Sequence, residues 1–235
     1  MDGLPIITFS AMAIAFLPSL GVILIMKAWR LEPGQAIWAN VRMLGQLLAV
    51  GYVLTFIFET EDPWIVAGVV SVMMTAAAWI ALRPLETRTP RKYVMALGAI
   101  GSAGLMMLIL VTQLALELPS WFEPRFVVPI AGMIFANAMN TVSLAAERFE
   151  SECGSGASYI EARNTAMTAA LIPQINALLA VGLVSLPGMM TGQILSGVEP
   201  LVAVRYQVVV MCMIFGSSGL SAAAYLVTAK EKDTP

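Results

Sequence analysis

The chain has 235 residues, of which 59% are hydrophobic and only 12% charged, and its mean hydropathy is +0.82. Soluble domains carry about 25% charged residues, so a soluble globule of this size is excluded, and a net charge of −2 argues against a basic nucleic-acid-binding face. The chain has no histidine and two cysteines, which excludes His-based catalysis, zinc ligation and a disulfide framework. We therefore expect an all-α, polytopic integral membrane protein that is not an enzyme and holds no cofactor or metal of its own.

Charge-free intervals predict the membrane spans. In chain order they are 4–26, 43–58, 63–82, 93–116, 126–146, 164–198 and 206–229. A helix needs about 20 apolar residues to cross a hydrocarbon layer of about 30 Å, and five of these intervals fit that length directly. The interval 43–58 is short, so we expect the second span to start near Ala36 and Arg42 to extend toward the lipid headgroups.

The interval 164–198 is too long for one span. Its 35 residues would form a helix of about 52 Å. We expect this helix to break at residues 185–188 (SLPG), because proline and glycine both disrupt a helix interior. We also expect a kink at Pro173. The chain is thus predicted to have about seven spans.

The distribution of lysine and arginine predicts the orientation. If the N-terminus lies outside, the cytosolic segments carry eleven basic residues and the outer segments carry two, Arg125 and Arg205. This bias follows the positive-inside rule. We expect the N-terminus outside and the C-terminus in the cytosol.

The polar residues inside the spans are amides and hydroxyls. No carboxylate or lysine falls in the middle of a span, which argues against a proton-driven carrier. Asn137, Asn140, Ser185 and Gln193 either form interhelical hydrogen bonds or line a pathway. The chain has no Walker motif, so any ATP must be bound by another chain.

Two glycine patterns occur at helix-packing spacing. Gly98-x-x-Gly101-x-x-Gly104 indicates a close approach between helices. Gly188-x-x-x-Gly192 lies at the expected break, so it fits a hinge as well as a packing site.

A polar segment at about 147–165 is the longest cytosolic connection. Ser158 and Glu161 have the spacing of a capping box, in which each side chain binds the other residue's backbone amide. Gly154 and Gly156 permit a tight turn just before the cap. This pattern predicts a cytosolic elbow at the start of a helix, and the alternative is a plain solvated loop.

Three blocks of the sequence resemble the FetB-type ABC transporter permeases, a family that includes bacterial iron-export permeases and plant aluminium-tolerance permeases. The longest block is 181–192 (VGLVSLPGMMTG), preceded by 169–173 (AALIP). The other two are 129–134 (PIAGMI) with 137–139 (NAM), and Arg42 and Gln46 with 51–54 (GYVL). The resemblance extends from about residue 36 to 228, and it departs from the family pattern at Tyr159, where proline is usual.

The resemblance implies a single transmembrane permease domain, 1–235, in the bacterial inner (plasma) membrane. Such a permease forms a homodimer over a dimer of ATP-binding subunits and exports iron or another metal species by alternating access. The elbow would be the ATPase-coupling element, with Gly156, Ala157, Ser158, Glu161, Ala162 and Arg163. The expected translocation and gating residues are Asn137, Asn140, Pro173, Gly182, Ser185, Pro187, Gly188, Met189, Met190, Gly192 and Gln193.

Two other functions remain open. The elbow is altered relative to the family, which fits a non-transport scaffold or assembly subunit that keeps a permease-like fold. An ATP-independent channel is the third possibility.

Overall fold

The computed structural model of the chain describes residues 8–231, and nearly all of them are helical. The chain divides between residues 59 and 60 into two compact units, and each is described by itself. The first unit contains α1 (Phe9–Ala15), α2 (Leu17–Ala28) and α3 (Gly34–Phe58). Residues 10–28 and α3 are long and apolar enough to span a membrane. Because α3 begins at Gly34, the expected backward extension of the second span past Arg42 is confirmed.

The second unit is a helical bundle. It contains α4 (Pro63–Ala81), α5 (Pro90–Ile109), the π-helix η1 (Leu110–Ala115), α6 (Pro124–Gly154), α7 (Tyr159–Ala180), α8 (Gly188–Leu195), α9 (Pro200–Thr228) and the short 3₁₀ helix η2 (Ala229–Glu231). Proline is the first residue of α4, α5, α6 and α9. The first helical position tolerates proline because its backbone N–H would have no partner there, so the sequence marks where these four helices begin.

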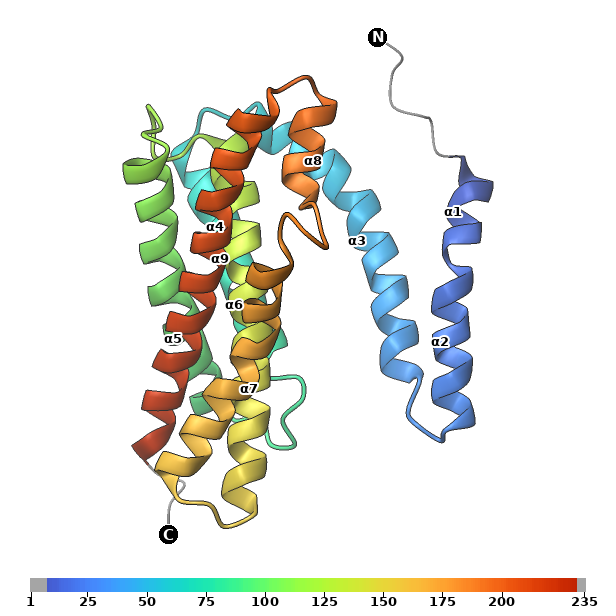
Figure 1. Cartoon of the computed structure of the whole chain (residues 1–235), viewed down its shortest axis with the longest axis vertical. Coiled ribbons are helices and arrows are strands. Elements are labelled where there is room, and N and C mark those ends of the chain that lie inside the picture. Colours follow the sequence, from blue (N-terminus) through green and yellow to red (C-terminus); the bar gives the residue numbers. More distant parts are fainter. Residues whose placement is uncertain (1–7, 232–235) are drawn as a thin grey trace. The chain divides into compact units, whose positions relative to one another are not determined.

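Helix α6 lies at the centre of this bundle, where it packs against α4, α5, α7 and α9 (Figure 1). Small residues permit the closest approach, as at Ala145 of α6, Ala166 of α7 and Ala222 of α9, which are fully buried in one core cluster. Gly101 and Gly104 of α5 face the Met74 and Phe135 side chains, as the glycine spacing predicted. Gly98 has open space instead.

The two ends of this bundle differ in charge. We call the end formed by residues 82–89, 155–158 and the C-terminus of α9 the turn end, and the end formed by 116–123 and 181–199 the break end (Figure 1). Among the described residues of this unit, the turn end carries Arg83, Arg88, Arg91, Lys92, Arg148, Arg163 and Lys230, and the break end carries Arg125 and Arg205. Under the positive-inside rule, the turn end is the cytosolic one.

Six helical segments of the described chain are long and apolar enough to cross a membrane: 10–28, α3, α4, 90–115, α6 and α9. They coincide with six of the seven predicted spans. The seventh predicted interval, 164–198, contains α7, an irregular segment at 181–187 that we call the break, and α8. Helix α7 has 22 residues and is therefore about 33 Å long, but Glu161, Arg163 and Asn164 make its first turns polar.

Candidate functional site

A tight turn connects α6 to α7. Gly156 has a φ of 86°, a left-handed conformation that glycine adopts without strain. The Ala157 amide donates to the carbonyl of Glu152 at 3.1 Å, which ends α6, and α7 starts two residues later. The predicted coupling residues Gly156, Ala157 and Ser158 thus lie together at the turn end.

The predicted capping box is confirmed. The Ser158 hydroxyl accepts from the Glu161 amide at 3.4 Å, and the Ser158 amide donates to Glu161 Oε2 at 3.0 Å. The Ser158 hydroxyl also donates to Glu161 Oε2 at 2.7 Å. Because the hydroxyl and the amide of Ser158 both stabilise the carboxylate, the pKa of Glu161 lies below its ordinary value.

Tyr159 joins this turn to α9. Its hydroxyl donates to the carbonyl oxygen of Leu226 at 3.1 Å. Its ring meets Phe149 of α6 edge to face, with a centroid distance of 6.0 Å, and the charged groups of Arg163 and Lys230 each lie 5.7 Å from its centroid. One side chain therefore contacts α6, α7 and the C-terminal end of α9.

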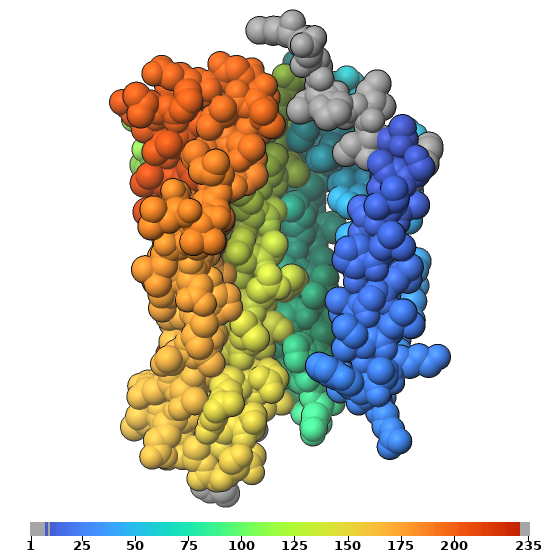
Figure 2. All heavy atoms as spheres, turned by 45° about the vertical axis from the view of Figure 1, so that its right-hand side comes forward, coloured from blue at the N-terminus to red at the C-terminus, as the bar shows by residue number. Residues whose placement is uncertain are grey.

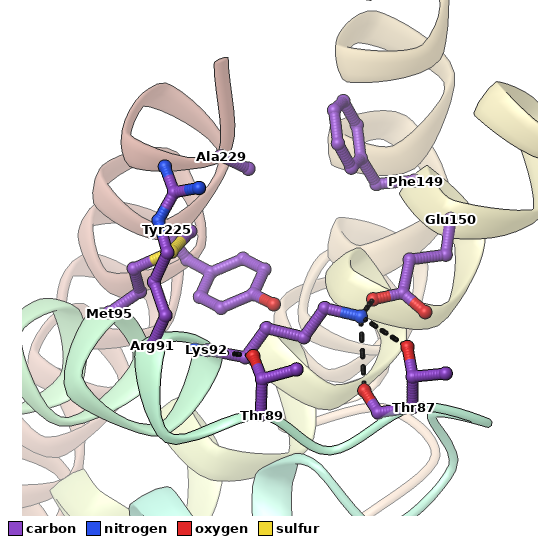
Figure 3. A pocket seen from close by; sticks show the side chains of 9 residues that line it. All are labelled: Thr87, Thr89, Arg91, Lys92, Met95, Phe149, Glu150, Tyr225 and Ala229. Atoms are coloured by element: carbon purple, nitrogen blue, oxygen red, sulfur yellow. Dashed lines mark hydrogen bonds and ion pairs between the residues drawn. The ribbon is translucent and has the colours of Figure 1, made fainter. Parts of the chain in front are cut away.

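An ion pair joins α5 and α6 at the turn end (Figure 3). Lys92 Nζ lies 2.6 Å from Glu150 Oε1, and it donates to Thr87 Oγ1 at 2.9 Å and to the Thr87 carbonyl at 3.0 Å. These contacts hold the loop at 82–89 against the end of α6. They border a cavity of about 350 Å³ that Arg91 and Tyr225 also line.

A buried polar network links α6 and α7 in the middle of the bundle. Gln174 is 8% exposed, and its amide donates to Thr141 Oγ1 at 3.3 Å and to Asn137 Oδ1 at 3.5 Å. Asn137 in turn donates to the Met133 carbonyl at 2.8 Å. Of the predicted polar pathway residues on α6, Asn137 thus serves an interhelical contact, while Asn140 is exposed.

The predicted break exists, but it begins earlier than residues 185–188. Helix α7 ends at Ala180, Gly182 has a φ of 81°, and its amide donates to the Ser185 carbonyl at 2.9 Å. The predicted gating residues Gly182, Ser185 and Pro187 lie in this break. Gly188, Met189, Met190, Gly192 and Gln193 lie in α8, and Pro173 lies inside α7 on an exposed side. Figure 2 shows the break and α8 in orange at one end and the α6–α7 turn in yellow at the other.

A cavity of about 340 Å³ lies at the break end, and we call it the break-end pocket. Its polar lining groups are Arg125 of α6, Gln193 of α8 and Tyr206 of α9. Gln193 Oε1 is buried and has no hydrogen-bond partner in the described structure. The remaining lining residues are Val111, Leu116, Phe126, Pro129, Ile130, Met133, Met189, Val198, Val202, Val209 and Val210.

Only some of the predicted translocation residues therefore line the pocket. Met189 and Gln193 line it, whereas Ser185, Asn137 and Asn140 do not. Sequence reasoning did not identify Arg125, Tyr206, Gln174 or Tyr159 as site residues. The spacing of Asn137 and Thr141, four residues apart on one helix face, indicated a polar face that needed a partner such as Gln174. The described residues contain no group of three or more His, Cys, Asp or Glu placed to hold a metal ion.

Comparison with known proteins gives the family. A family model described as "Uncharacterised protein family (UPF0014)" matches residues 9–163 and 156–232. The chain belongs to this family. The two matches overlap at 156–163, which is the α6–α7 turn and the first turn of α7. The expected resemblance is confirmed, because the curated relatives of the chain include a probable iron export permease and a plant protein named for aluminium sensitivity.

Three relatives show how far the similarity extends. The "UPF0014 membrane protein slr1647" of Synechocystis is 35% identical over 83% of this chain and 81% of its own length. The "Probable iron export permease protein FetB" of Escherichia coli is 32% identical over 95% of this chain and 92% of its own length. "Protein ALUMINUM SENSITIVE 3" of Arabidopsis thaliana is 31% identical over 80% and 73%. No solved structure matches the chain.

Proposed function

We propose that this protein is the membrane-spanning permease subunit of an ABC-type exporter in the bacterial inner (plasma) membrane. A separate dimer of ATP-binding subunits would supply the energy, and two copies of this chain would form the permease. The similarity to the E. coli relative, named as a probable iron export permease, supports this function. The six apolar helical segments of the described chain support the membrane location. The whole chain would act as one permease domain, 1–235, with the coupling elbow at about 147–165.

One observation carries the proposal: a single helix, α7, connects the turn end with the break. It starts at the capping box of Ser158 and Glu161 and ends at Ala180. The chain is not helical between Ala180 and Gly188, where α8 begins. A force applied to the turn would therefore be transmitted along α7, while the break lets α8 respond separately. Broken helices at membrane depth are tolerated where they line protein or a cavity, and α8 lines the break-end pocket.

In the proposed cycle, closure of the ATPase dimer pushes the α6–α7 turn. The motion reaches α9 as well, because Tyr159 binds the Leu226 carbonyl at the same end. Tilting of α7 and α9 would then change access to the pocket between α6, α8 and α9. The cargo would be a small solute, and the name of the E. coli relative makes iron or another metal species the first candidate.

Co-purification and ATPase measurements test this function. The full chain, isolated from its native membrane in mild detergent, should carry a stoichiometric nucleotide-binding chain, and the complex should hydrolyse ATP. The double variant Ser158→Ala with Glu161→Ala should lower transport-coupled ATPase activity, because it removes both halves of the capping box. Arg91→Gln is the matched control, because Arg91 is an exposed residue of α5 at the same end and lies outside the elbow.

Three results would contradict the proposal in different ways. Consistent absence of a nucleotide-binding chain would favour a scaffold. Conductance in liposomes without nucleotide would favour a channel. Unchanged ATPase activity and export in the double variant would remove the coupling role from the turn.

A further inference from the structure

The charge among the lining residues of the break-end pocket is positive and comes from one residue. Arg125 is the only charged residue among the lining residues, and the acidic residues of the same end, Glu61, Asp62, Glu117, Glu123 and Glu199, are not among them. Arg125 forms no ion pair in the described structure. We propose that this pocket binds an amphipathic organic anion, which is the substrate class of the transport function proposed above and rests on that function.

Helix ends around the pocket add to its positive potential. Arg125 and Phe126 are in the first turn of α6, Met189 is in the first turn of α8 and Val202 is in the first turn of α9. A helix N-terminus carries about half a unit of positive charge from its unpaired N–H groups. Two C-terminal ends oppose these three N-terminal ends, that of η1 at Leu116 and the last turn of α8 at Gln193, so Arg125 is the main source of the positive potential. An anionic group is thus favoured here and a bare cation is disfavoured.

The remaining wall is apolar. Phe126 and Ile130 of α6 face the same cavity as Val202 and Val209 of α9, and Met133 and Met189 add thioether side chains. The volume of about 340 Å³ falls within the range of small-molecule sites, about 300–1,000 Å³. Such a wall buries a hydrocarbon or aromatic body and gains little from a small hydrated ion. A metal cargo would therefore enter this pocket as an anionic chelate with organic ligands.

Gln193 indicates a further property of the ligand. Its Oε1 atom is buried without a hydrogen-bond partner in the described structure, and a buried acceptor without a partner carries an energetic cost. A ligand hydroxyl or amide that donates to this oxygen would remove that cost. The ligand class is therefore an anion that has an apolar body and one hydrogen-bond donor.

Binding of three probes that share a phenol ring and carry an anionic, a neutral or a cationic group tests the proposal. The full chain in nanodiscs of zwitterionic lipid is titrated, without ATP or a partner, with radiolabelled 4-hydroxybenzoate, 4-hydroxybenzamide and 4-hydroxybenzylamine. We expect the carboxylate to bind at least tenfold more tightly than the amide, and the amine to bind most weakly. Arg125→Gln should weaken carboxylate binding at least tenfold, whereas Arg205→Gln should leave it within twofold, because Arg205 is an exposed arginine at the same end that does not line the pocket.

A companion comparison tests Gln193. Benzoate lacks the hydroxyl donor, so it should bind more weakly than 4-hydroxybenzoate, and Gln193→Leu should abolish that difference. Folding of each variant is checked by its unfolding transition and elution volume.

Several outcomes would overturn the proposal. They are tightest binding of the amine, no binding of any probe, and equal carboxylate binding in Arg125→Gln and the parent chain. Displacement of 4-hydroxybenzoate by added phosphatidylglycerol would assign the site to a lipid headgroup. It would therefore contradict the proposal that the pocket binds the transported solute. Failure of this inference can be distinguished from failure of the transport function. Anion binding without ATP-driven export would contradict the function, and export without anion binding would contradict this inference.

Discussion

The hydroxyl of Tyr159 donates to the carbonyl oxygen of Leu226 at 3.1 Å, across a separation of 67 residues. This bond ties the first residue of α7 to the last turn of α9. The carbonyls in the last turn of a helix have no partner within the helix, so the tyrosine satisfies a group that would otherwise need water. The hydrogen bond therefore attaches the α6–α7 turn to α9 as well as to α7, which begins at Tyr159.

Tyr159→Phe should destabilise the protein by about 1 kcal/mol, because it removes one hydrogen bond and keeps the ring. Tyr159→Ala should cost more, since it also removes the contacts with Phe149, Arg163 and Lys230. Reversible unfolding in mixed micelles measures both. Tyr93→Phe is the control, because its hydroxyl lies 3.5 Å from the Thr75 carbonyl, at the limit of a hydrogen bond. Equal effects of the two Phe variants would refute the role of the Leu226 contact.

The capping box should make stability depend on pH. The pKa of Glu161 is lowered in the folded protein by the Ser158 hydroxyl and amide, so its stabilisation is present above the ordinary pKa of 4.5 and is lost as the pH falls through the lowered folded value. The stability difference between the parent and Glu161→Gln should be constant at neutral pH and should shrink below about pH 4.5.

A double-variant comparison gives the control for this pH effect. In a Ser158→Ala background the effect of Glu161→Gln on stability should become smaller at neutral pH, because the shortest hydrogen bond to the carboxylate is gone. If the effect of Glu161→Gln does not change with pH in the parent background, the capping interaction does not depend on the charge of Glu161.

Glycines of α5 should respond to alanine substitution according to their neighbours. A Cβ at Gly104 would lie 2.6 Å from Phe135 Cε1 and 3.2 Å from Ile134 Cγ2, and an aromatic ring in a packed core cannot withdraw easily. We expect Gly104→Ala to cost about 1–3 kcal/mol. Gly98→Ala has nothing within 4 Å and should be neutral or stabilising by up to about 1 kcal/mol. The free energy of unfolding of both variants, measured in mixed micelles, tests this difference. Equal destabilisation by the two substitutions would contradict the packing of α5 on α6.

The Gln174 network should contribute to the α6–α7 contact. Gln174→Leu would remove both donor contacts, to Asn137 and Thr141, and we expect a cost of about 1 kcal/mol, in line with interhelical hydrogen bonds in membranes. Asn176→Leu, an exposed position two residues later on α7, should have a smaller effect. A larger loss for Asn176→Leu would show that the exposed face of α7 matters more than the network.

Local patterns in the sequence predicted much of this fold. Charge-free intervals located the long helices, because a membrane span must be apolar along its whole length. The spacing of Ser158 and Glu161 predicted the start of α7, since a capping box uses groups only three residues apart. The proline and glycine at 187–188 predicted an interruption, and α8 does begin at Gly188.

Sequence reasoning did not predict where α7 ends or which distant segments are in contact. The end of α7 at Ala180 depends on the Gly182 conformation and on the bond from its amide to the Ser185 carbonyl. The partners of Tyr159 and Gln174 lie on other helices, and no local pattern indicated the π-helix at 110–115. The break-end pocket combines residues from four helices and two connecting segments, and no local pattern places Arg125 beside Gln193 and Tyr206.

Cysteine accessibility tests the central claim, that nucleotide binding by the partner ATPase acts through the turn end and changes access to the break-end pocket. In a background without Cys153 and Cys212, Met189→Cys is labelled with a membrane-impermeant maleimide in sealed vesicles that contain the partner ATPase. Leu183→Cys, at a highly exposed position in the break, is the control. The account predicts labelling from the outer side at Met189→Cys, with a rate that changes severalfold when ATP and vanadate are added, while the rate at Leu183→Cys stays nearly constant. A rate at Met189→Cys that is the same with and without nucleotide would contradict it.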